Sequence, residues 1–230
     1  LLPFVLSMLF SSLTLQQAAS NLIEQACYFH DLTLLIITLI LLIIGWVIVD
    51  LVLLGTPYVD FSESTMLEVW WTILPRLVLI SLAIPSLRLL YLIDEVGAPD
   101  LSINVLGHQW FWEYNYPDFK GVSFESYIIR DTLGQVVRLI DVDNRVVVPF
   151  NSRARVLISS TDVLHSWAMP SIGLKADATP GRLNQVNLTP WVRGLFYGQC
   201  SEICGANHRF IPIVLEVISP ERFIKWVNSW

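Results

Sequence analysis

Two long apolar segments dominate the first part of the chain. Residues 32–49 contain no charged side chain, and apolar character continues to residue 54. A second apolar segment covers residues 69–93, where Arg76 and Arg88 carry the only charges. Because a membrane-spanning helix needs about 20 apolar residues, the pattern predicts two spans, about 32–54 and 69–93, in a hairpin domain of residues 26–95. The length of the charge-free run disfavours the alternative, two buried helices in a soluble core.

A two-span hairpin places both ends of the chain on the same side of the membrane. The connecting loop, residues 55–68, holds Asp60, Glu63 and Glu68 but no Lys or Arg, so the positive-inside rule gives no orientation. The N-terminal segment, residues 1–25, begins with a mostly apolar stretch that ends near residue 15. This stretch is too short to span a bilayer and is similar to a signal-peptide core without its basic start. We expect it to be retained.

The pattern changes after residue 96, where short runs rich in Val, Ile, Phe and Tyr alternate with turn signals. Many short strands predict an all-β antiparallel sandwich or Greek-key barrel in a domain of residues 96–230. Pro220 followed by Glu221 predicts a short C-terminal helix. The predicted strands are residues 103–106, 107–116, 123–130, 136–141, 145–149, 155–159, 186–188, 194–198 and 214–218.

Composition supports a membrane part and a water-exposed part. The 230 residues are 54% apolar and 15% charged, which excludes disorder and disfavours an ordinary soluble enzyme. Residues 1–93 hold six of the 20 acidic and two of the 14 basic residues. The net charge of −6 disfavours nucleic acid as a partner and favours a basic partner.

The candidate chemistry lies near the C-terminus. Cys200, Cys204 and His208 follow one another at intervals of four residues, and His165 lies upstream. Thiolate and imidazole ligands suit copper, zinc or iron. The spacing predicts a metal site without choosing the metal, and a structural zinc site or a redox disulfide stays open. His165 alone is more typical of a hydrogen-bonded core histidine, and Cys27 stands apart.

These motifs resemble the subunit II family of the haem–copper cytochrome c oxidases, in a mitochondrial version. The resemblance covers most of the chain and is weakest over residues 1–20. The most specific match is the long segment of residues 197–208. The other matching segments are residues 29–31, 71–75, 84–88, 107–112, 142–146, 162–167, 173–177 and 180–182.

The resemblance implies a cupredoxin-like Greek-key barrel that holds a binuclear copper centre, CuA. Cys200 and Cys204 would bridge the two coppers, and His165 and His208 would each bind one. The backbone carbonyl of Glu202 would be a weak ligand to the copper that His208 binds. The carboxylate of Glu202 would reach a magnesium ion shared with subunit I, whereas the residue taken alone is a solvated loop side chain.

One position departs from the family pattern. The family places a methionine three residues after the second histidine, where this chain has Ile211. Isoleucine has no lone pair to donate. We therefore expect copper to bind through its thiolates and imidazoles with a raised reduction potential. Alternatively, RNA editing or an unusual genetic code makes the true residue different.

The resemblance also implies partners and a location. Cytochrome c would deliver electrons at Trp110, which strand alternation would place on the same face as Trp112. Glu68 would mark the entrance of a proton path into subunit I, although interfacial snorkelling explains it equally simply. The acids that would steer cytochrome c are Glu113, Asp118, Glu125, Asp131, Asp141, Asp143 and Asp162.

The implied function is electron entry into cytochrome c oxidase. Electrons would pass from cytochrome c through CuA to haem in subunit I, where oxygen is reduced to water and protons are pumped. The chain would lie in the mitochondrial inner membrane, with the β domain and both termini in the intermembrane space. A quinol-oxidase subunit II lacks the copper ligands, so the Cys and His pairs argue against it. A membrane-anchored structural or zinc-binding module is the third hypothesis.

Overall fold

The computed structural model describes residues 14–55, 63–94, 97–130 and 137–230. The chain forms two compact units, one of residues 25–92 and one that combines the segment ending at Glu24 with residues 93–230. The expectation for residues 1–15 falls almost wholly outside the described residues. Asp60, Asp131 and the first residue of the predicted strand 136–141 also lie outside them.

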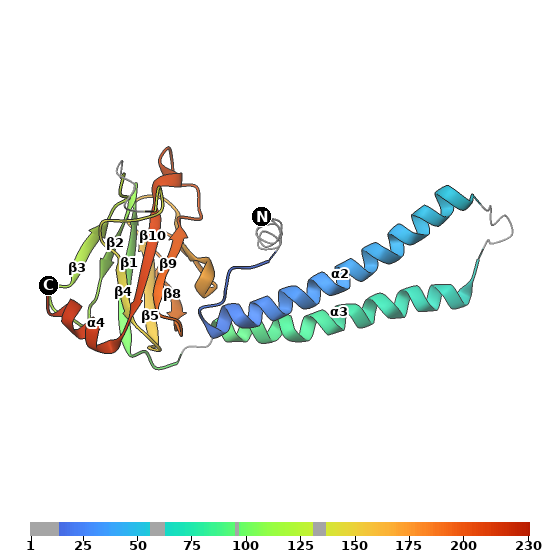
Figure 1. The fold of residues 1–230 in the computed structure, drawn as a ribbon, viewed down its shortest axis with the longest axis horizontal. Helices are drawn as coiled ribbons and strands as arrows, with labels where there is room; N and C mark the ends of the chain where they lie inside the picture. Colours follow the sequence, from blue (N-terminus) through green and yellow to red (C-terminus); the bar gives the residue numbers. More distant parts are fainter. Residues whose placement is uncertain (1–13, 56–62, 95–96, 131–136) are drawn as a thin grey trace, which may run out of the picture. The chain divides into compact units, whose positions relative to one another are not determined.

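The first unit is a pair of long helices, α2 (Asn21–Leu54) and α3 (Thr65–Asp94) (Figure 1). Most of their apolar side chains are exposed, as a lipid-facing surface requires, and both helices are long and apolar enough to cross a membrane. The helix α2 begins at Asn21, before the predicted span, because residues 21–31, a mixture of polar and apolar side chains without Gly or Pro, extend it toward Ser20. The Ser20 hydroxyl accepts a hydrogen bond from the Ile23 amide at 3.3 Å, as an N-cap does.

The second unit is mostly β-structure, as predicted. One sheet has the strand order β3-β2-β1-β5-β8, a second has β4-β10-β9, and β6 pairs with β7. The pairs β1–β5 and β4–β10 are parallel, so the unit is mixed rather than purely antiparallel. The strands are β1 (Leu101–His108), β2 (Phe111–Asn115), β3 (Ser123–Ser126), β4 (Val146–Pro149), β5 (Ala154–Ser160), β6 (His165–Met169), β7 (Leu174–Ala178), β8 (Asn184–Leu188), β9 (Gly194–Gln199) and β10 (Pro212–Ile218).

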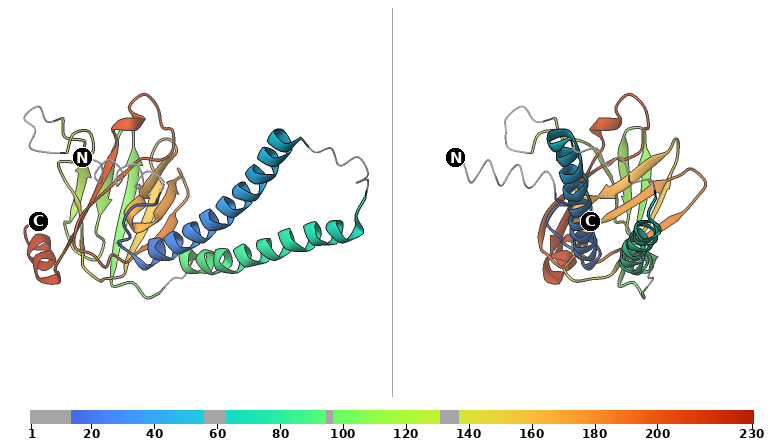
Figure 2. Two further views of the ribbon diagram at one scale, coloured as in Figure 1. Left: turned by 45° about the vertical axis from the view of Figure 1, so that its right-hand side comes forward. Right: turned by 90° about the vertical axis from the view of Figure 1, so that its right-hand side faces the viewer.

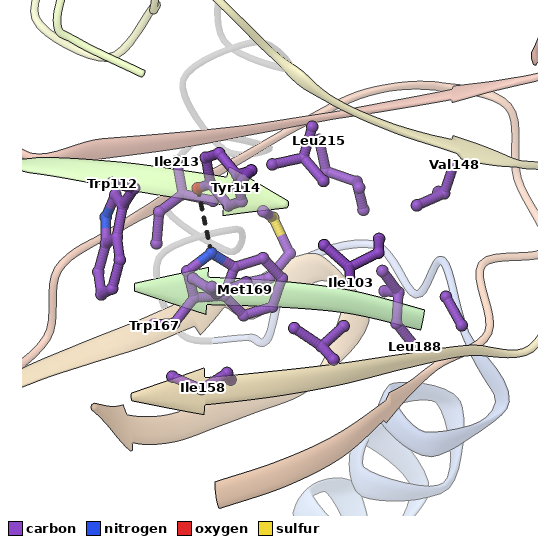
Figure 3. Packing of buried hydrophobic residues seen from close by; sticks show 14 of the residues in the cluster. Ile103, Trp112, Tyr114, Val148, Ile158, Trp167, Met169, Leu188, Ile213 and Leu215 are labelled. Atoms are coloured by element: carbon purple, nitrogen blue, oxygen red, sulfur yellow. Dashed lines mark hydrogen bonds between the residues drawn. The ribbon is translucent and has the colours of Figure 1, made fainter. Parts of the chain in front are cut away.

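A core of large side chains lies between these sheets (Figure 3). Trp112 and Tyr114 from β2 meet Trp167 from β6, and all three are buried. The Trp167 indole donates a hydrogen bond to the Tyr114 hydroxyl at 3.3 Å, so the polar atoms of both rings are satisfied inside the core. The predicted C-terminal helix is α4 (Pro220–Val227), and it packs Trp226 edge-on against Tyr116.

Three strand predictions differ from the structure. Residues 137–141 form a turn rather than a strand, with Leu139 at a φ of 68° and the Asp141 amide bonded to the Val137 carbonyl. The predicted strand 107–116 is broken by a turn at Gln109 and Trp110, and the predicted strand 123–130 ends at Ser126. The sequence pattern missed β6, because all five of its residues are buried and show no alternation. It also missed β7, which alternates but contains no Val, Ile, Phe or Tyr.

Candidate metal centre

Three of the predicted ligands converge at one end of the β unit. His165 begins β6, Cys200 directly follows β9, and Cys204 lies in the ligand loop, which we define as residues 200–208. The ligand atoms of these three buried residues lie within 4.8 Å of one another. The Cys200 sulfur lies 3.9 Å from Nδ1 of His165.

The fourth predicted ligand lies beside this cluster. His208 begins the short helix η2 (His208–Phe210), and its Nδ1 lies 3.5 Å from the Cys204 sulfur. Its amide donates to the Gly205 carbonyl at 3.2 Å, which folds the ligand loop back toward Cys204. The four side chains therefore form two sulfur–nitrogen pairs, His165 with Cys200 and His208 with Cys204.

Neighbouring elements hold the ligand loop in place. The Cys200 amide donates to the Ile211 carbonyl and the Ser201 amide to the Ser166 carbonyl, each at 3.0 Å. The Cys204 carbonyl accepts from Nε2 of Gln109 at 2.8 Å and from the Trp110 indole at 3.3 Å. The loop is thus tied to β6, to the start of β10 and to the β1–β2 turn.

Gly205 makes this close approach possible. Its φ is +122°, and a Cβ placed there would lie 3.2 Å from Nε2 of Gln109 and 3.3 Å from the Trp110 ring. Only glycine adopts this conformation without strain, so a side chain here would push the loop away from the turn.

Asp162 orients His165. Its Oδ1 lies 2.9 Å from Nε2 of His165, which leaves Nδ1 directed at Cys200. The same carboxylate accepts the amides of Gln109 and Val163, each at 2.6 Å. A carboxylate behind a histidine is the usual way to fix the tautomer of a metal ligand. Spacing alone did not single out Asp162 for this role, although an acid three residues before a candidate histidine is a readable signal.

The electrostatics of the metal-free site favour a cation. Burial opposes ionisation of Cys200, but the hydrogen bond with His165 leaves its pKa below the ordinary thiol value. Burial and the neighbouring charge of Cys200 raise the pKa of Cys204. Burial disfavours the charged form of His165, yet Cys200 and Asp162 raise its pKa overall. Two thiolates cannot share this space without a positive charge between them, so the donor set fits a soft or borderline metal ion.

Glu202 and Ile211 occupy different surroundings. The Glu202 carbonyl lies 3.4 Å from the Cys200 sulfur, so this backbone oxygen faces the cluster. Its carboxylate has no hydrogen bond or ion pair within the described part of the chain. The Ile211 side chain is 1% exposed and belongs to the hydrophobic core, and it adds no donor atom.

The expectation that Trp110 and Trp112 share a strand face is wrong. Trp110 lies in the β1–β2 turn, half-buried, with its indole on the ligand loop. Trp112 is fully buried in β2 and packs edge-on against the His165 ring at 5.8 Å between centroids. The turn separates the two rings, because it ends the alternation on which the expectation depended.

The predicted acidic patch is only partly free to meet a partner. Asp141 is buried and paired with Arg145 at 3.2 Å, and the Asp118 carboxylate accepts the Ser102 amide at 2.6 Å. Two further acids of the patch contact a stack of three aromatic rings, His108, Phe111 and Tyr127. Glu113 pairs with His108, and Glu125 accepts a hydrogen bond from the Tyr127 hydroxyl. In this stack Phe111 lies between the rings of His108 and Tyr127. Glu68 belongs to the other unit, in the first turn of α3, where it is exposed.

Comparison with known proteins identifies the family. The family model "Cytochrome C oxidase subunit II, periplasmic domain" matches residues 101–218, and "Cytochrome C oxidase subunit II, transmembrane domain" matches residues 9–89. Cytochrome c oxidase subunit 2 of Choristoneura rosaceana is 49% identical over 224 residues, which cover 96% of this chain and 98% of that protein. The Drosophila melanogaster protein of the same name is 48% identical over 223 residues, with 95% and 97% covered.

A solved structure agrees with the fold of the β unit. The crystal structure of the periplasmic domain of subunit II of cytochrome oxidase of Bradyrhizobium japonicum is 42% identical, with a TM-score of 0.55. It covers 59% of this chain and 96% of its own. The two family models and the two full-length relatives together account for nearly every residue. The chain belongs to the cytochrome c oxidase subunit II family, in which a copper centre is implied.

Proposed function

We propose that this chain is the electron-entry subunit of cytochrome c oxidase. It accepts electrons from cytochrome c at a binuclear copper centre and passes them to haem in subunit I. The observation that carries the proposal is the buried convergence of His165, Cys200 and Cys204, with His208 beside Cys204. The residues present fit the group, because thiolates and imidazoles are donors that suit copper.

The contacts of four side chains support the ligand set that we propose. Cys200 and Cys204 would each supply a thiolate to both coppers, His165 and His208 would each hold one copper through Nδ1, and the Glu202 carbonyl would be a weak further donor. When bound, the copper pair supplies a one-electron relay whose charge change is shared between two metals. The protein holds the loop from three elements, so the ligands need little movement when an electron arrives or leaves.

The docking surface for cytochrome c is proposed at the β1–β2 turn. The Trp110 indole donates to the Cys204 carbonyl, so one hydrogen bond joins this half-buried ring to a proposed copper ligand. Glu113 and Glu125 lie on nearby β2 and β3 and would steer a basic partner. Arg145 neutralises Asp141, so that acid contributes to stability rather than to steering.

The remaining roles rest on the family alone. We propose that the Glu202 carboxylate meets a magnesium ion at the border with subunit I, and that Glu68 stands at the entrance of a proton path. The hairpin crosses the mitochondrial inner membrane, with the β domain of residues 96–230 and both termini in the intermembrane space. Protease applied from the intermembrane-space side, after the outer membrane is opened, should cleave the β domain. Cleavage only from the matrix side would reverse the topology.

Electron paramagnetic resonance with metal analysis tests the main proposal. The full chain loaded with copper should give a seven-line mixed-valence signal and two coppers per chain. Cys204→Ser should abolish this signal, whereas Cys27→Ser, which removes the third cysteine from the helical unit, should leave it intact. Tightly bound zinc without a signal would favour the structural module, and no bound metal would favour a quinol-type subunit.

A further inference from the structure

A groove between the two long helices combines a cation with an apolar wall. It is lined by residues 25, 28, 29 and 32 of α2 and by residues 85, 88, 89 and 92 of α3. Each set has the spacing i, i+3, i+4, i+7 of one helix face, so one face of α2 lies opposite one face of α3 across the groove. Toward Leu54 and Thr65 the helices diverge (Figure 2). The groove has a volume of about 150 Å³.

The polar side chains of the groove lie at one border of the apolar segments. Gln25 and Tyr28 precede the charge-free run of α2, and Arg88 comes shortly before the end of α3 at Asp94. Arg88 and Tyr28 are exposed. Tyrosine and arginine at such a border meet the headgroup level of a bilayer.

These polar groups have no partner within the described part of the chain. Neither Arg88, Tyr28 nor Gln25 makes a side-chain hydrogen bond or ion pair there. The two acids of α2 on either side of these residues, Glu24 and Asp31, are not among the lining residues, and Asp31 is 3.3 Å from Nδ1 of its neighbour His30. Arg88 therefore presents an uncompensated positive charge beside two neutral groups that can donate hydrogen bonds.

The rest of the groove is apolar. Phe29 and Leu32 face Pro85, Leu89 and Leu92, which give hydrocarbon contact and no charge. A free phosphate would leave this wall uncovered, and a zwitterionic lipid would bring a cation of its own beside Arg88. The volume equals about five water molecules, enough for the start of an acyl chain while the remainder lies in the bilayer.

We propose that this groove binds an anionic phospholipid. The phosphate is held by the Arg88 guanidinium, with the Tyr28 hydroxyl and the Gln25 amide as further donors. One acyl chain begins between Phe29 and Leu89. The proposal rests on the proposed insertion of the hairpin in a membrane and is independent of the copper centre.

Photolabelling tests this assignment on the assembled oxidase that contains the full chain. The complex is reconstituted in phosphatidylcholine vesicles with a trace of photoactivatable phosphatidylglycerol or, separately, phosphatidylcholine. Mass spectrometry should find cross-links in peptides covering residues 25–32 and 85–92. The phosphatidylglycerol probe should label them about fivefold more than the phosphatidylcholine probe, the selectivity expected from one basic residue near the surface.

Variants separate the Arg88 site from general attraction to anionic lipid. Arg88→Gln should remove the fivefold preference and Arg88→Lys should retain most of it. Arg76→Gln, which deletes the other arginine of α3 outside the groove, should leave it unchanged. A competition experiment needs only the wild-type complex, so it remains informative if a variant fails to assemble. Excess unlabelled phosphatidylglycerol should compete with the photoactivatable phosphatidylglycerol and reduce its labelling of the groove.

Several results would overturn the assignment. Equal labelling by both probes would show that the groove does not select the anionic headgroup. An unchanged labelling preference in the Arg88→Gln complex would show that Arg88 does not bind the phosphate. Displacement by glycerol phosphate at the same concentration as lipid would point to a simple anion site. Absence of label from the assembled complex would mean that another subunit fills the groove. The copper signal is measured on the same samples, so a wild-type complex with an intact copper signal and no phosphatidylglycerol labelling refutes this proposal and spares the proposed function.

Discussion

Replacing Asp162 by asparagine should weaken copper binding although residue 162 is not a ligand. The carboxylate uses both oxygens: Oδ1 lies 2.9 Å from Nε2 of His165, and Oδ2 accepts the Gln109 amide at 2.6 Å. Asparagine has the same shape but one acceptor oxygen. If that oxygen faces His165, the new amide group points its donors at the Gln109 N–H.

The cost can be worked from these two contacts. A hydrogen bond to a charged group contributes roughly 1.5–3 kcal/mol, and either orientation of the substituted amide loses at least one such bond, since Oδ1 also accepts the Val163 amide. In one orientation the His165 ring loses its support. In the other the turn of Gln109 and Trp110 loosens, and with it the two hydrogen bonds to the Cys204 carbonyl. Loss of a supporting carboxylate typically lowers metal affinity about tenfold to a hundredfold, which is the loss we expect for Asp162→Asn.

The assay is competitive copper titration of the full chain against a chelator, followed by electron paramagnetic resonance. Glu113→Gln is the matched control, since it removes one negative charge beside His108 without touching the ligands. Both variants should slow association with cytochrome c, but only Asp162→Asn should weaken copper binding and change the copper signal. Equal copper affinity in all three proteins would refute the positioning role. An equal loss of copper affinity in both variants would show that the effect comes from the change in net charge and not from positioning of His165.

Three further outcomes follow from the same geometry. Ile211→Met should lower the reduction potential of the copper centre and leave its copper content unchanged. Because the two buried side chains have similar volumes, the substitution should lower the free energy of unfolding by less than about 1.5 kcal/mol, measured by thermal unfolding. A rise in copper occupancy from near zero to full would show that an axial ligand governs assembly. Gly205→Ala should cost about 1–3 kcal/mol of backbone strain at φ +122° and reduce copper retention. The control Gly121→Ala is also at positive φ but has open space around it, so it should leave copper retention unchanged. Equal copper retention in the two variants would show that the close contact of residue 205 with Trp110 does not matter for the site. In the metal-free protein, the pKa of Asp162 is lowered, so its contribution to stability is lost as pH falls through that pKa; the pKa of His165 is raised, so its contribution is lost as pH rises through that pKa. The denaturant midpoint should therefore peak between the two pKa values, and Asp162→Asn should flatten the peak. An unchanged pH profile in the variant would contradict the pairing of Asp162 with His165.

The sequence predicted the elements that have a clear compositional signal. The charge-free run of residues 32–49 indicated α2, and the strands β1 and β5 were recognised as short runs rich in Val and Ile. The strand β6 was missed because all its residues are buried, which removes the period of two. The turn at residues 137–141 resembled a strand by composition, but backbone hydrogen bonds within the turn decide its conformation.

The candidate site was predicted in part for a similar reason. Spacing and ligand chemistry pointed to Cys200, Cys204 and His208, whereas His165 taken alone was more typical of a core residue. Its assignment needed the family resemblance. The supports of the site, Gln109 and Asp162, lie 53 residues apart in the chain and meet through one 2.6 Å hydrogen bond. No local pattern announces such a contact, because the parallel pairing of β1 with β5 creates it.

That pairing also explains why the proposed entry surface and the proposed copper ligands belong together. The parallel register of β1 and β5 places Gly107 opposite Ser160, so the segments that follow both strands leave the sheet at the same end. One segment carries Gln109 and Trp110, and the other carries Asp162 and His165. The Asp162 carboxylate joins the two segments, and Gln109 and Trp110 both reach the Cys204 carbonyl. A surface turn and a buried ligand loop are therefore held by the same few bonds, so a change that loosens the turn must also disturb the ligands.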